Sequence, residues 1–394
     1  MSFEAIKKLD DAYIMHTYGR YNIAIDHGKG AICYDPTGKS YIDFTSGIGV
    51  NALGFADEGW IAAITAQLNQ LQHISNLYYT EPCALAAKLL CEKSGMKKVF
   101  FGNSGAEANE GAIKAARKYS FQKYGAGRSK IVALENSFHG RTMAALSATG
   151  QAAYHNFFFP FLEGFVFAKA NDTADTLSKL TEDVCAVMLE LVQGEGGVLP
   201  LEQEYVQAVY HACKERDILF IVDEVQTGIG RTGTFYAYQQ FGIQPDLVSS
   251  AKGLGGGLPI GAVLFGEKTQ DTLIPGDHGS TFGGNPVVCA GAAAVLNRMD
   301  NAFLQEVTAK GHYMQEEIKK MPHVTEVAGM GMMLGIELDM EVAPVVHALM
   351  ENGLLVLTAK HKMRLLPPLS IAQTELEKGL SILKNTLTTL GKQA

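Results

Sequence analysis

The sequence predicts an α/β protein in which a large domain has a mostly parallel central sheet with helices on both faces, beside a smaller α+β domain. Between residues 95 and 266, short apolar runs alternate with helical stretches, as in βαβ units. The apolar runs show no in/out alternation, which indicates strands that are buried on both faces. The chain has 394 residues, of which 47% are hydrophobic, so it can bury a large core and a smaller companion.

The elements are expected in a fixed order along the chain. Residues 1–50 contain a hairpin whose turn runs from Pro36 to Gly38, and we expect this segment to pack with the small domain. Residues 51–290 are expected to form the large domain, with helices over residues 106–123 and 201–216 and buried strands in KKVFFGN, KIVALE, VCAVMLELV, ILFIVDEV, DLVSSA and GAVLFG. Residues 291–394 are expected to form the small domain, from helices, the segment VTEVAGMGMMLGIELD and a final helix.

Composition excludes several classes of function. The net charge of -8 argues against nucleic-acid binding, because a protein that binds a phosphate backbone normally carries a basic surface. No run of 18 apolar residues occurs and the first residues are charged, so we expect a cytoplasmic protein that does not enter a membrane. The cysteines lack CxxC spacing and are expected to be reduced core residues that form neither disulfides nor a metal site, namely Cys33, Cys83, Cys91, Cys185, Cys213 and Cys289.

A strand that ends at Phe101 is followed directly by Ser104, Gly105, Ala106 and a helix. The free N–H groups and the positive dipole end of such a helix favour a phosphate, and a glycine lets the ligand approach the backbone. The alternative is an ordinary strand-to-helix turn with a serine N-cap. Because loops meet in a crevice at the carboxyl ends of parallel strands, we expect chemistry at this end of the sheet.

Two further residues predict a site for a heterocyclic cofactor. Asp223 ends an apolar strand, and a buried carboxylate needs a partner such as a protonated ring nitrogen, whose pKa it would raise. A helix cap or a salt bridge is the alternative for Asp223. Lys252 lies among glycines that would leave room for a flat ring, and a lysine in a confined site can condense with an aldehyde. The alternative for this stretch is a flexible turn.

The segment ENSFHGRTMAALS adds an aromatic ring and a cation. Phe138 could stack on a flat ring, and Arg141 could hold a carboxylate through two hydrogen bonds. The alternatives are a core phenylalanine and a surface arginine. Together the phosphate cradle, the aromatic ring, the strand-end carboxylate and the lysine are the groups that pyridoxal phosphate needs.

The ordered motifs NSGAEANEGAIKAAR, FHGRT, QGEGG, VDEVQTGIGRTG, AKGLGGGLPIGA and GSTFGGNP resemble those of class III (subgroup II) pyridoxal-phosphate aminotransferases, over nearly the whole chain. The resemblance implies the fold type I architecture and a homodimer with two active sites at the subunit interface. It also implies that Lys252 bonds covalently to the cofactor and moves the substrate proton, and that Asp223 pairs with the pyridine nitrogen. The cofactor contacts that it implies are Ser104, Gly105, Ala106, Phe138, Asp223, Glu224, Val225, Gln226 and Lys252, with Ser280 and Thr281 contributed by the partner subunit.

The resemblance also assigns the groups that bind substrate. Arg141 would hold the distal carboxylate of either substrate, and Arg364 would receive the α-carboxylate of 2-oxoglutarate. Glu195 would neutralise Arg364 while the amino donor is bound. We expect this pair to separate easily, because a solvent-exposed ion pair contributes about 1 kcal/mol or less.

The amino donor is expected to be N-acetylornithine, in arginine biosynthesis. Ornithine-specific members of the family carry a tyrosine in the segment that matches DFTSGIGVNALG, where this chain has small residues and Ile48. Donors left open are ornithine, succinylornithine, succinyldiaminopimelate and 4-aminobutyrate. A decarboxylase or racemase on the same fold and a cofactor-binding module without activity are further alternatives. The chain departs from the family pattern at Phe55, Asp57 and Leu191.

Overall fold

The computed structural model describes residues 1–392 and contains a central sheet with the strand order β4-β12-β11-β10-β7-β5-β6. Strand β12 is antiparallel to both of its neighbours, whereas the remaining pairs in this sheet are parallel. The prediction of a mostly parallel sheet is therefore confirmed. The strands are β4 (Lys98–Gly102), β5 (Lys130–Leu134), β6 (Phe165–Ala168), β7 (Val184–Leu189), β10 (Leu219–Asp223), β11 (Leu247–Ser250) and β12 (Gly261–Phe265).

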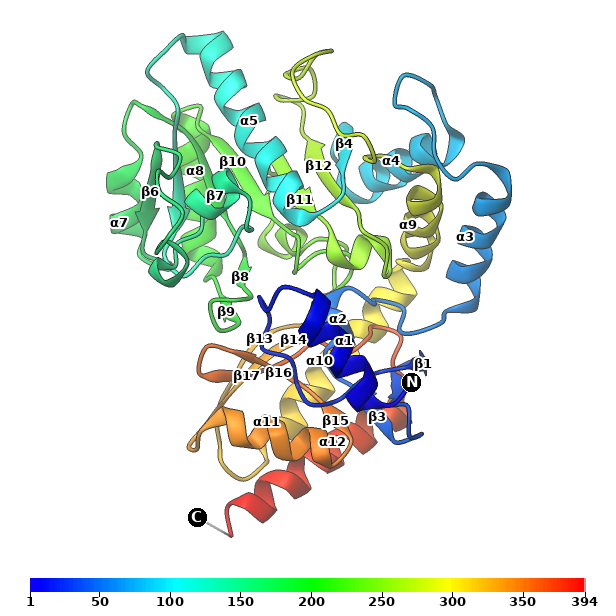
Figure 1. Cartoon of the computed structure of the whole chain (residues 1–394). Coiled ribbons are helices and arrows are strands. Elements are labelled where there is room, and N and C mark those ends of the chain that lie inside the picture. The colour runs from blue at the N-terminus through cyan, green and yellow to red at the C-terminus, as the bar shows by residue number, and fades with distance from the viewer. Residues whose placement is uncertain (393–394) are drawn as a thin grey trace.

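Helices cover both faces of the central sheet (Figure 1). Every residue of β7 and β10 is buried, which explains the unbroken apolar runs in the sequence. On one face, Ala186 and Met188 of β7 join a core with helix α5 (Gly105–Tyr124). On the other face, Val187 and Leu189 join a core with helix α8 (Gln203–Glu215). Alternate residues of one strand thus face two helical layers. Helices α6 (Met143–Ser147) and α7 (Thr173–Lys179) lie in the connections between strands.

Three helices form a group beside the edge strand β4, namely α3 (Glu58–Gln70), α4 (Glu81–Ser94) and α9 (Pro286–Arg298). The indole N–H of Trp60 in α3 donates to the carbonyl of Gly255 at 3.1 Å, which ties this group to the segment after β11. The predicted domain boundary at residue 290 lies inside α9. The division into domains stays a prediction.

The N-terminal segment lies beside the C-terminal part of the chain, as the blue and red ends of Figure 1 show. The predicted hairpin is confirmed, because β2 (Ile32–Tyr34) and β3 (Ser40–Asp43) are antiparallel on either side of the turn. Strand β3 also pairs with β15 (Leu354–Leu355), in a sheet completed by β1 (His27–Lys29). Helices α1 (Phe3–Tyr13) and α2 (Ser46–Gly49) flank this sheet in the sequence.

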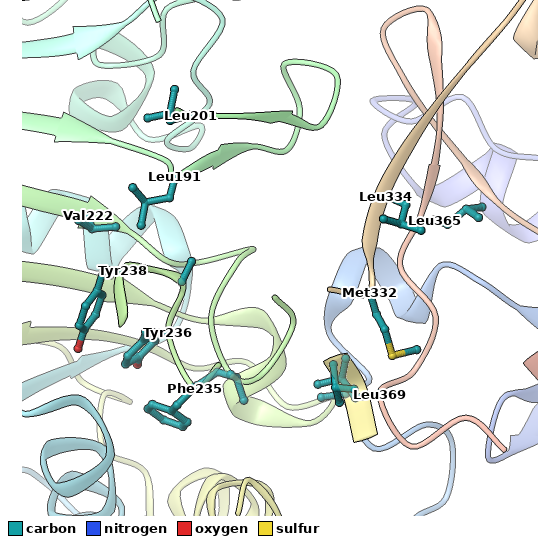
Figure 2. Packing of buried hydrophobic residues seen from close by; sticks show 14 of the residues in the cluster. Leu191, Leu201, Val222, Phe235, Tyr236, Tyr238, Met332, Leu334, Leu365 and Leu369 are labelled. Carbon is teal, nitrogen blue, oxygen red and sulfur yellow. The ribbon is translucent and has the colours of Figure 1, made fainter. Parts of the chain in front are cut away.

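A second C-terminal sheet has the order β13-β14-β17-β16, with strands β13 (Val324–Met330), β14 (Met333–Leu338), β16 (Leu357–Ala359) and β17 (Lys362–Leu365). Its helices are α10 (Asn301–Lys319), α11 (Val342–Glu351) and α12 (Gln373–Leu390). One core cluster includes residues of both large and small sheets. Figure 2 shows Leu191 and Val222 on the side of the central sheet and Leu334 and Leu365 on the C-terminal strands. Leu191, which departs from the family pattern, is fully buried in this cluster.

The six cysteines are free thiols, and four of them are buried as expected, whereas Cys83 and Cys91 are half-buried. Among residues 1–392, no cluster of three histidine, cysteine or acidic side chains could hold a metal ion. The helices within the same range include none whose length and hydrophobicity would suit a membrane span.

Candidate active site

A cavity of about 470 Å³ opens at the carboxyl ends of the parallel strands. Val50 and Gly257 contribute to its wall together with residues that follow β4, β5, β7, β10 and β11. The structure brings most of the residues predicted from the sequence to this wall, namely Ser104, Gly105, Ala106, Phe138, Arg141, Asp223, Val225, Gln226 and Lys252.

One end of the cavity is the N-terminus of α5. Ser104 is the N-cap, and its hydroxyl accepts a hydrogen bond from the Glu107 N–H at 3.1 Å. The first main-chain bond of the helix runs from Ala108 to Ser104, so the N–H groups of Gly105 and Ala106 are free to bind an anion. A Cβ atom at Gly105 would lie 2.6 Å from Cγ1 of Val225, so the close packing of these two segments requires glycine. This donor set fits a phosphate group.

A second part of the cavity wall carries Asp223, the last residue of β10, which is only 3% exposed. Its Oδ2 accepts hydrogen bonds from Asn109 Nδ2 at 2.7 Å and His139 Nδ1 at 2.8 Å. Its Oδ1 accepts the N–H of Val225 at 3.0 Å. Burial alone would lower the pKa of His139, but the hydrogen bond and charge of Asp223 outweigh burial and raise it. These donors orient the Asp223 carboxylate in the cavity wall, and this arrangement fits a protonated ring nitrogen.

Lys252 follows β11, the strand next to β10, and so lies on the same side of the sheet as Asp223. Its backbone is in the left-handed region, with φ of 45°, which is uncommon for a residue with a side chain. No hydrogen bond from Lys252 Nζ to another of residues 1–392 is found. Burial lowers the pKa of this amine, which favours the neutral, nucleophilic form, although the charge of Glu195 acts in the opposite direction.

The glycines after Lys252 serve mainly to pack the main chain, which differs from the expectation that they make room for a ring. A Cβ at Gly255 would lie 3.0 Å from Ile260, and one at Gly256 would lie 2.7 Å from Trp60. Within this run Gly257 lines the cavity. The glycine run therefore fixes the turn that places Lys252 in the cavity wall, and Trp60 of helix α3 packs against this turn.

Glu195 and Arg364 form an ion pair beside the cavity. Arg364 Nη1 donates to Glu195 Oε1 at 2.6 Å and to Gln226 Oε1 at 3.1 Å. Burial acts to raise the pKa of Glu195, but the Arg364 charge outweighs it and the pKa is lowered. The side chain of Arg364 is 3% exposed and that of Glu195 is 25% exposed. The expectation of a weak, solvent-exposed pair is therefore wrong, because β17 is flanked on both sides by strands and places Arg364 inside the protein.

Arg141 has a different environment from Arg364. Its guanidinium carbon lies 4.2 Å from the ring centre of Tyr154 and 5.6 Å from that of Phe138. Within residues 1–392 its guanidinium has no hydrogen bond or ion pair with the protein. Arg141 is exposed and lines the cavity, so its donors remain available to a ligand.

Besides the Glu195–Arg364 pair, three more predicted residues lie off the cavity wall. Glu224 is fully buried, and its carboxylate accepts hydrogen bonds from the Tyr238 N–H at 2.9 Å and the Thr227 hydroxyl. Its side chain holds the loop after β10 in place through these bonds, and the cofactor contact expected of Glu224 stays a prediction. Ser280 accepts a hydrogen bond from Asn103 Nδ2 at 3.1 Å, and Thr281 is exposed on the surface.

Asn109, His139 and Glu190 are wall residues that the sequence analysis missed. Glu190 accepts the N–H of Phe138 at 2.8 Å and the N–H of Gly194 at 3.2 Å, so it joins two loops of the site. Burial raises the pKa of Glu190 to about 7. Asn109 could have been suspected, because it lies one helical turn after Gly105 and Ala106 on the same face of α5. The sequence holds no comparable signal for Glu190.

The chain is similar to known proteins over almost its whole length. A family model described as aminotransferase class-III matches residues 13–387. The acetylornithine aminotransferase of Haemophilus ducreyi is 54% identical over 391 residues, which cover 98% of this chain and 100% of that protein. The acetylornithine aminotransferase of Caldanaerobacter subterraneus subsp. tengcongensis is 47% identical over 95% of this chain and 97% of that protein.

Solved structures give the same result. The ornithine aminotransferase of Toxoplasma gondii has a TM-score of 0.96 at 30% identity, covering 100% of this chain and 97% of that one. The acetylornithine aminotransferase of Elizabethkingia anophelis has a TM-score of 0.87 at 31% identity, covering 99% of this chain and 100% of that one. These likenesses agree with the fold expected from the motifs.

Proposed function

The chain belongs to the class-III aminotransferase family, and on this basis we propose that it is a pyridoxal-phosphate-dependent acetylornithine aminotransferase. The reaction transfers the δ-amino group of N2-acetyl-L-ornithine to 2-oxoglutarate. Its products are N-acetyl-L-glutamate 5-semialdehyde and L-glutamate, in arginine biosynthesis. The observation that carries the proposal is one cavity that has Lys252, Asp223 and the N-terminus of α5 in its wall.

The residues present fit pyridoxal phosphate. The free N–H groups of Gly105 and Ala106 would hold its phosphate, and Phe138 and Val225 would pack on its ring. When bound, this cofactor supplies an aldehyde that accepts the amino group and a protonated ring that withdraws electrons from the reacting carbon.

The protein's own groups then hold and move protons. Asp223 would pair with the ring nitrogen and favour its protonated form, and Asn109 and His139 orient the Asp223 carboxylate through their hydrogen bonds. Lys252, which has no hydrogen-bond partner at Nζ among the described residues, would hold the cofactor covalently through this amine. The same nitrogen, in its neutral form, would serve as the base that moves the proton of the substrate carbon.

Two arginines sort the two substrates. Arg141, which has free donors, binds the carboxylate remote from the reacting amine or ketone. Arg364 binds the α-carboxylate of 2-oxoglutarate when Glu195 moves away from it. When the amino donor binds, Glu195 and Arg364 form their ion pair again. Gln226 contacts both members of the pair, with its Nε2 3.4 Å from Glu195, and so provides a polar partner during the exchange.

Preference for the N-acetylated donor is supported by the part of the cavity wall that contains Val50. Val50 lines the cavity, and the neighbouring side chain of Ile48 is 39% exposed. This segment of the chain has no tyrosine that could bind the α-ammonium of ornithine. A neutral acetamido group needs no such partner.

We also propose that the working unit is a homodimer in the cytoplasm, in which Ser280 and Thr281 complete the site of the partner. Neither residue lines the cavity of its own chain. Large apolar side chains near them are exposed, including Leu77 at 87%, Tyr79 at 106% and Phe282 at 61%. A second copy of the chain would cover them.

A donor panel tests the proposal. Protein loaded with pyridoxal phosphate is mixed in single turnovers with N-acetylornithine, ornithine, succinylornithine, succinyldiaminopimelate or 4-aminobutyrate, and conversion of the cofactor to its amine form is followed by absorbance. N-acetylornithine should give the highest rate per molar concentration. A higher rate with another donor would replace the assigned substrate. Release of carbon dioxide, or racemisation without amino transfer, would indicate a different reaction class, and binding without turnover would indicate a non-catalytic module.

The Lys252→Ala variant is the matched control. It should fold and bind the cofactor but release it quantitatively after borohydride treatment and denaturation, because no covalent bond to the protein forms. Its multiple-turnover rate should fall by at least about 100-fold, the lower range for loss of a general base. Retention of normal turnover would show that Lys252 does not have the role proposed here.

A further inference from the structure

Arg141 is held in the cavity wall by aromatic rings alone. Its guanidinium has no hydrogen bond or ion pair with any of residues 1–392, whereas Arg364 is bound to Glu195 and Gln226. An exposed arginine without partners normally samples many rotamers, and ordering it on binding weakens affinity. If the Arg141 side chain has a fixed position, a contact other than a hydrogen bond or an ion pair must hold it there.

The ring of Tyr154 provides this contact. Its ring centre lies 4.2 Å from the Arg141 guanidinium carbon, within the range of a cation–π contact. The same ring makes an edge contact with Phe138, with centroids 5.7 Å apart and an interplanar angle of 69°. The two rings thus contact each other, and the Tyr154 ring is the nearer one to the Arg141 guanidinium.

The backbone around Tyr154 is itself anchored to this region. Tyr154 ends the short 3-10 helix η1 (Ala152–Tyr154), and Gln151 before it donates from Nε2 to the Ser137 carbonyl at 3.1 Å. His155 after it lies 2.9 Å, through Nε2, from the Leu146 carbonyl. Tyr154 does not line the cavity, and its hydroxyl has no hydrogen-bond partner among the described residues, so its influence on a substrate would pass through Arg141.

We propose that Tyr154 is a positioning residue for substrate specificity, which holds the Arg141 guanidinium flat against its ring and leaves the guanidinium edge free for a carboxylate. This inference rests on the proposed function, in which Arg141 binds the carboxylate remote from the reacting group. A planar guanidinium that is stacked on one face can still form two parallel hydrogen bonds along its edge. Selection for substrates with a remote carboxylate then depends on an aromatic ring at position 154.

The test compares Tyr154→Leu with Tyr154→Phe. Glutarate, a dicarboxylate that cannot react, is titrated into the cofactor-loaded protein by calorimetry. Leucine should weaken glutarate binding by about 3- to 30-fold, the range for loss of a cation–π contact. Phenylalanine keeps the ring and should stay within about twofold of the parent protein. Unchanged glutarate affinity in Tyr154→Leu, or equal losses in both variants, would overturn the proposal.

A second measurement separates positioning from general damage to the fold. In the donor half-reaction, Tyr154→Leu should raise KM for N-acetylornithine by the same factor as the glutarate dissociation constant, with kcat within about twofold. Pentylamine, which carries no carboxylate, should react equally with all variants. An equal loss for pentylamine would indicate a purely structural role. In an Arg141→Lys background, Tyr154→Leu should raise KM for N-acetylornithine by less than a further factor of about two, because lysine has no planar group to stack on the ring. A larger increase in KM would also contradict the proposal.

The glutarate titration needs no turnover, so its outcome does not depend on which donor the enzyme uses. If N-acetylornithine fails as a donor but Tyr154→Leu still weakens glutarate binding, the proposed function is wrong and the role of Tyr154 stands. If N-acetylornithine reacts and the glutarate affinity is unchanged, the role of Tyr154 is wrong and the proposed function stands.

Discussion

Replacing Arg364 with methionine should separate the two half-reactions of the enzyme. Methionine has a similar length and is apolar, so it suits a position that is 3% exposed in β17, but it removes the charge and every hydrogen bond to Glu195 and Gln226. The acceptor loses the partner of its α-carboxylate. The donor complex loses only the ion pair that holds Glu195 at rest.

The sizes of the two effects follow from burial. Truncating one partner of a buried, hydrogen-bonded charge pair costs about 2–5 kcal/mol, which corresponds to a loss of about 30- to 4,000-fold in kcat/KM for 2-oxoglutarate. Glu195 is 25% exposed and 3.4 Å from Gln226 Nε2, so water and this amide can solvate it after Arg364 is removed. The donor half-reaction should therefore slow by less than about tenfold.

The assay measures each half-reaction alone by stopped-flow absorbance, with thermal unfolding as the check on folding. Glu195→Gln is the matched variant, because it keeps the buried arginine but weakens its resting partner, and it should impair N-acetylornithine more than 2-oxoglutarate. If Arg364→Met mainly slows the 2-oxoglutarate half-reaction and Glu195→Gln mainly slows the N-acetylornithine half-reaction, the results would support an exchange of partners at Arg364. Equal losses of both half-reactions in Arg364→Met, with an unchanged melting temperature, would refute the reasoning.

Two further predictions concern the phosphate cradle and Glu190. Gly105→Ala should weaken pyridoxal phosphate binding by about tenfold or more, because the added Cβ would lie 2.6 Å from Val225. In fluorescence titrations of the apoprotein, the double variant Gly105→Ala/Val225→Ala should recover part of this lost affinity. No recovery would contradict a clash with Val225. Burial raises the pKa of Glu190 to about 7, so its stabilising contribution is complete below pH 4.5 and lost as the pH rises through 7. In denaturant titrations, the free energy of unfolding of Glu190→Gln should rise by up to about 3 kcal/mol relative to the parent protein between pH 5 and 8. The exposed control Glu202→Gln should show no such rise. Parallel pH profiles of Glu190→Gln and the parent protein would contradict burial of the charge.

Much of the fold could be predicted because the local pattern and the tertiary environment agree. The apolar runs at β7 and β10 contain no polar residue before the strand end, which only burial on both faces explains. Strand β6 was not predicted. It is short, lies at the edge of the sheet and follows the segment from Pro160 to Gly164, whose composition resembles a loop.

The site was predicted where one local motif carries the chemistry, and was missed where distant segments meet. Asp223 stands out as the last residue of a strand, and Lys252 stands out by its position just after one. Asn109 and His139 contact Asp223 from 114 and 84 residues away, and Glu190 reaches Phe138 across 52 residues. Such contacts depend on strand order, which a single sequence does not contain. The burial of Arg364 was misjudged for a related reason: β16 is the hairpin partner that directly precedes β17, but its other neighbour, β14, is separated from β17 by helix α11.

The charges around the cavity explain why its wall can select an anion. Arg364 is neutralised by Glu195, and Asp223 is bound to His139, whose pKa is raised. Burial favours the neutral forms of both Lys252 and Glu190. Among the wall residues that the structure describes, Arg141 thus remains as a charge without a protein partner. A substrate whose carboxylate lies far from its reacting group can satisfy Arg141 and reach Lys252 at once, whereas a simple amine of equal length leaves the guanidinium unpaired. The specificity of the site follows from this one uncompensated charge.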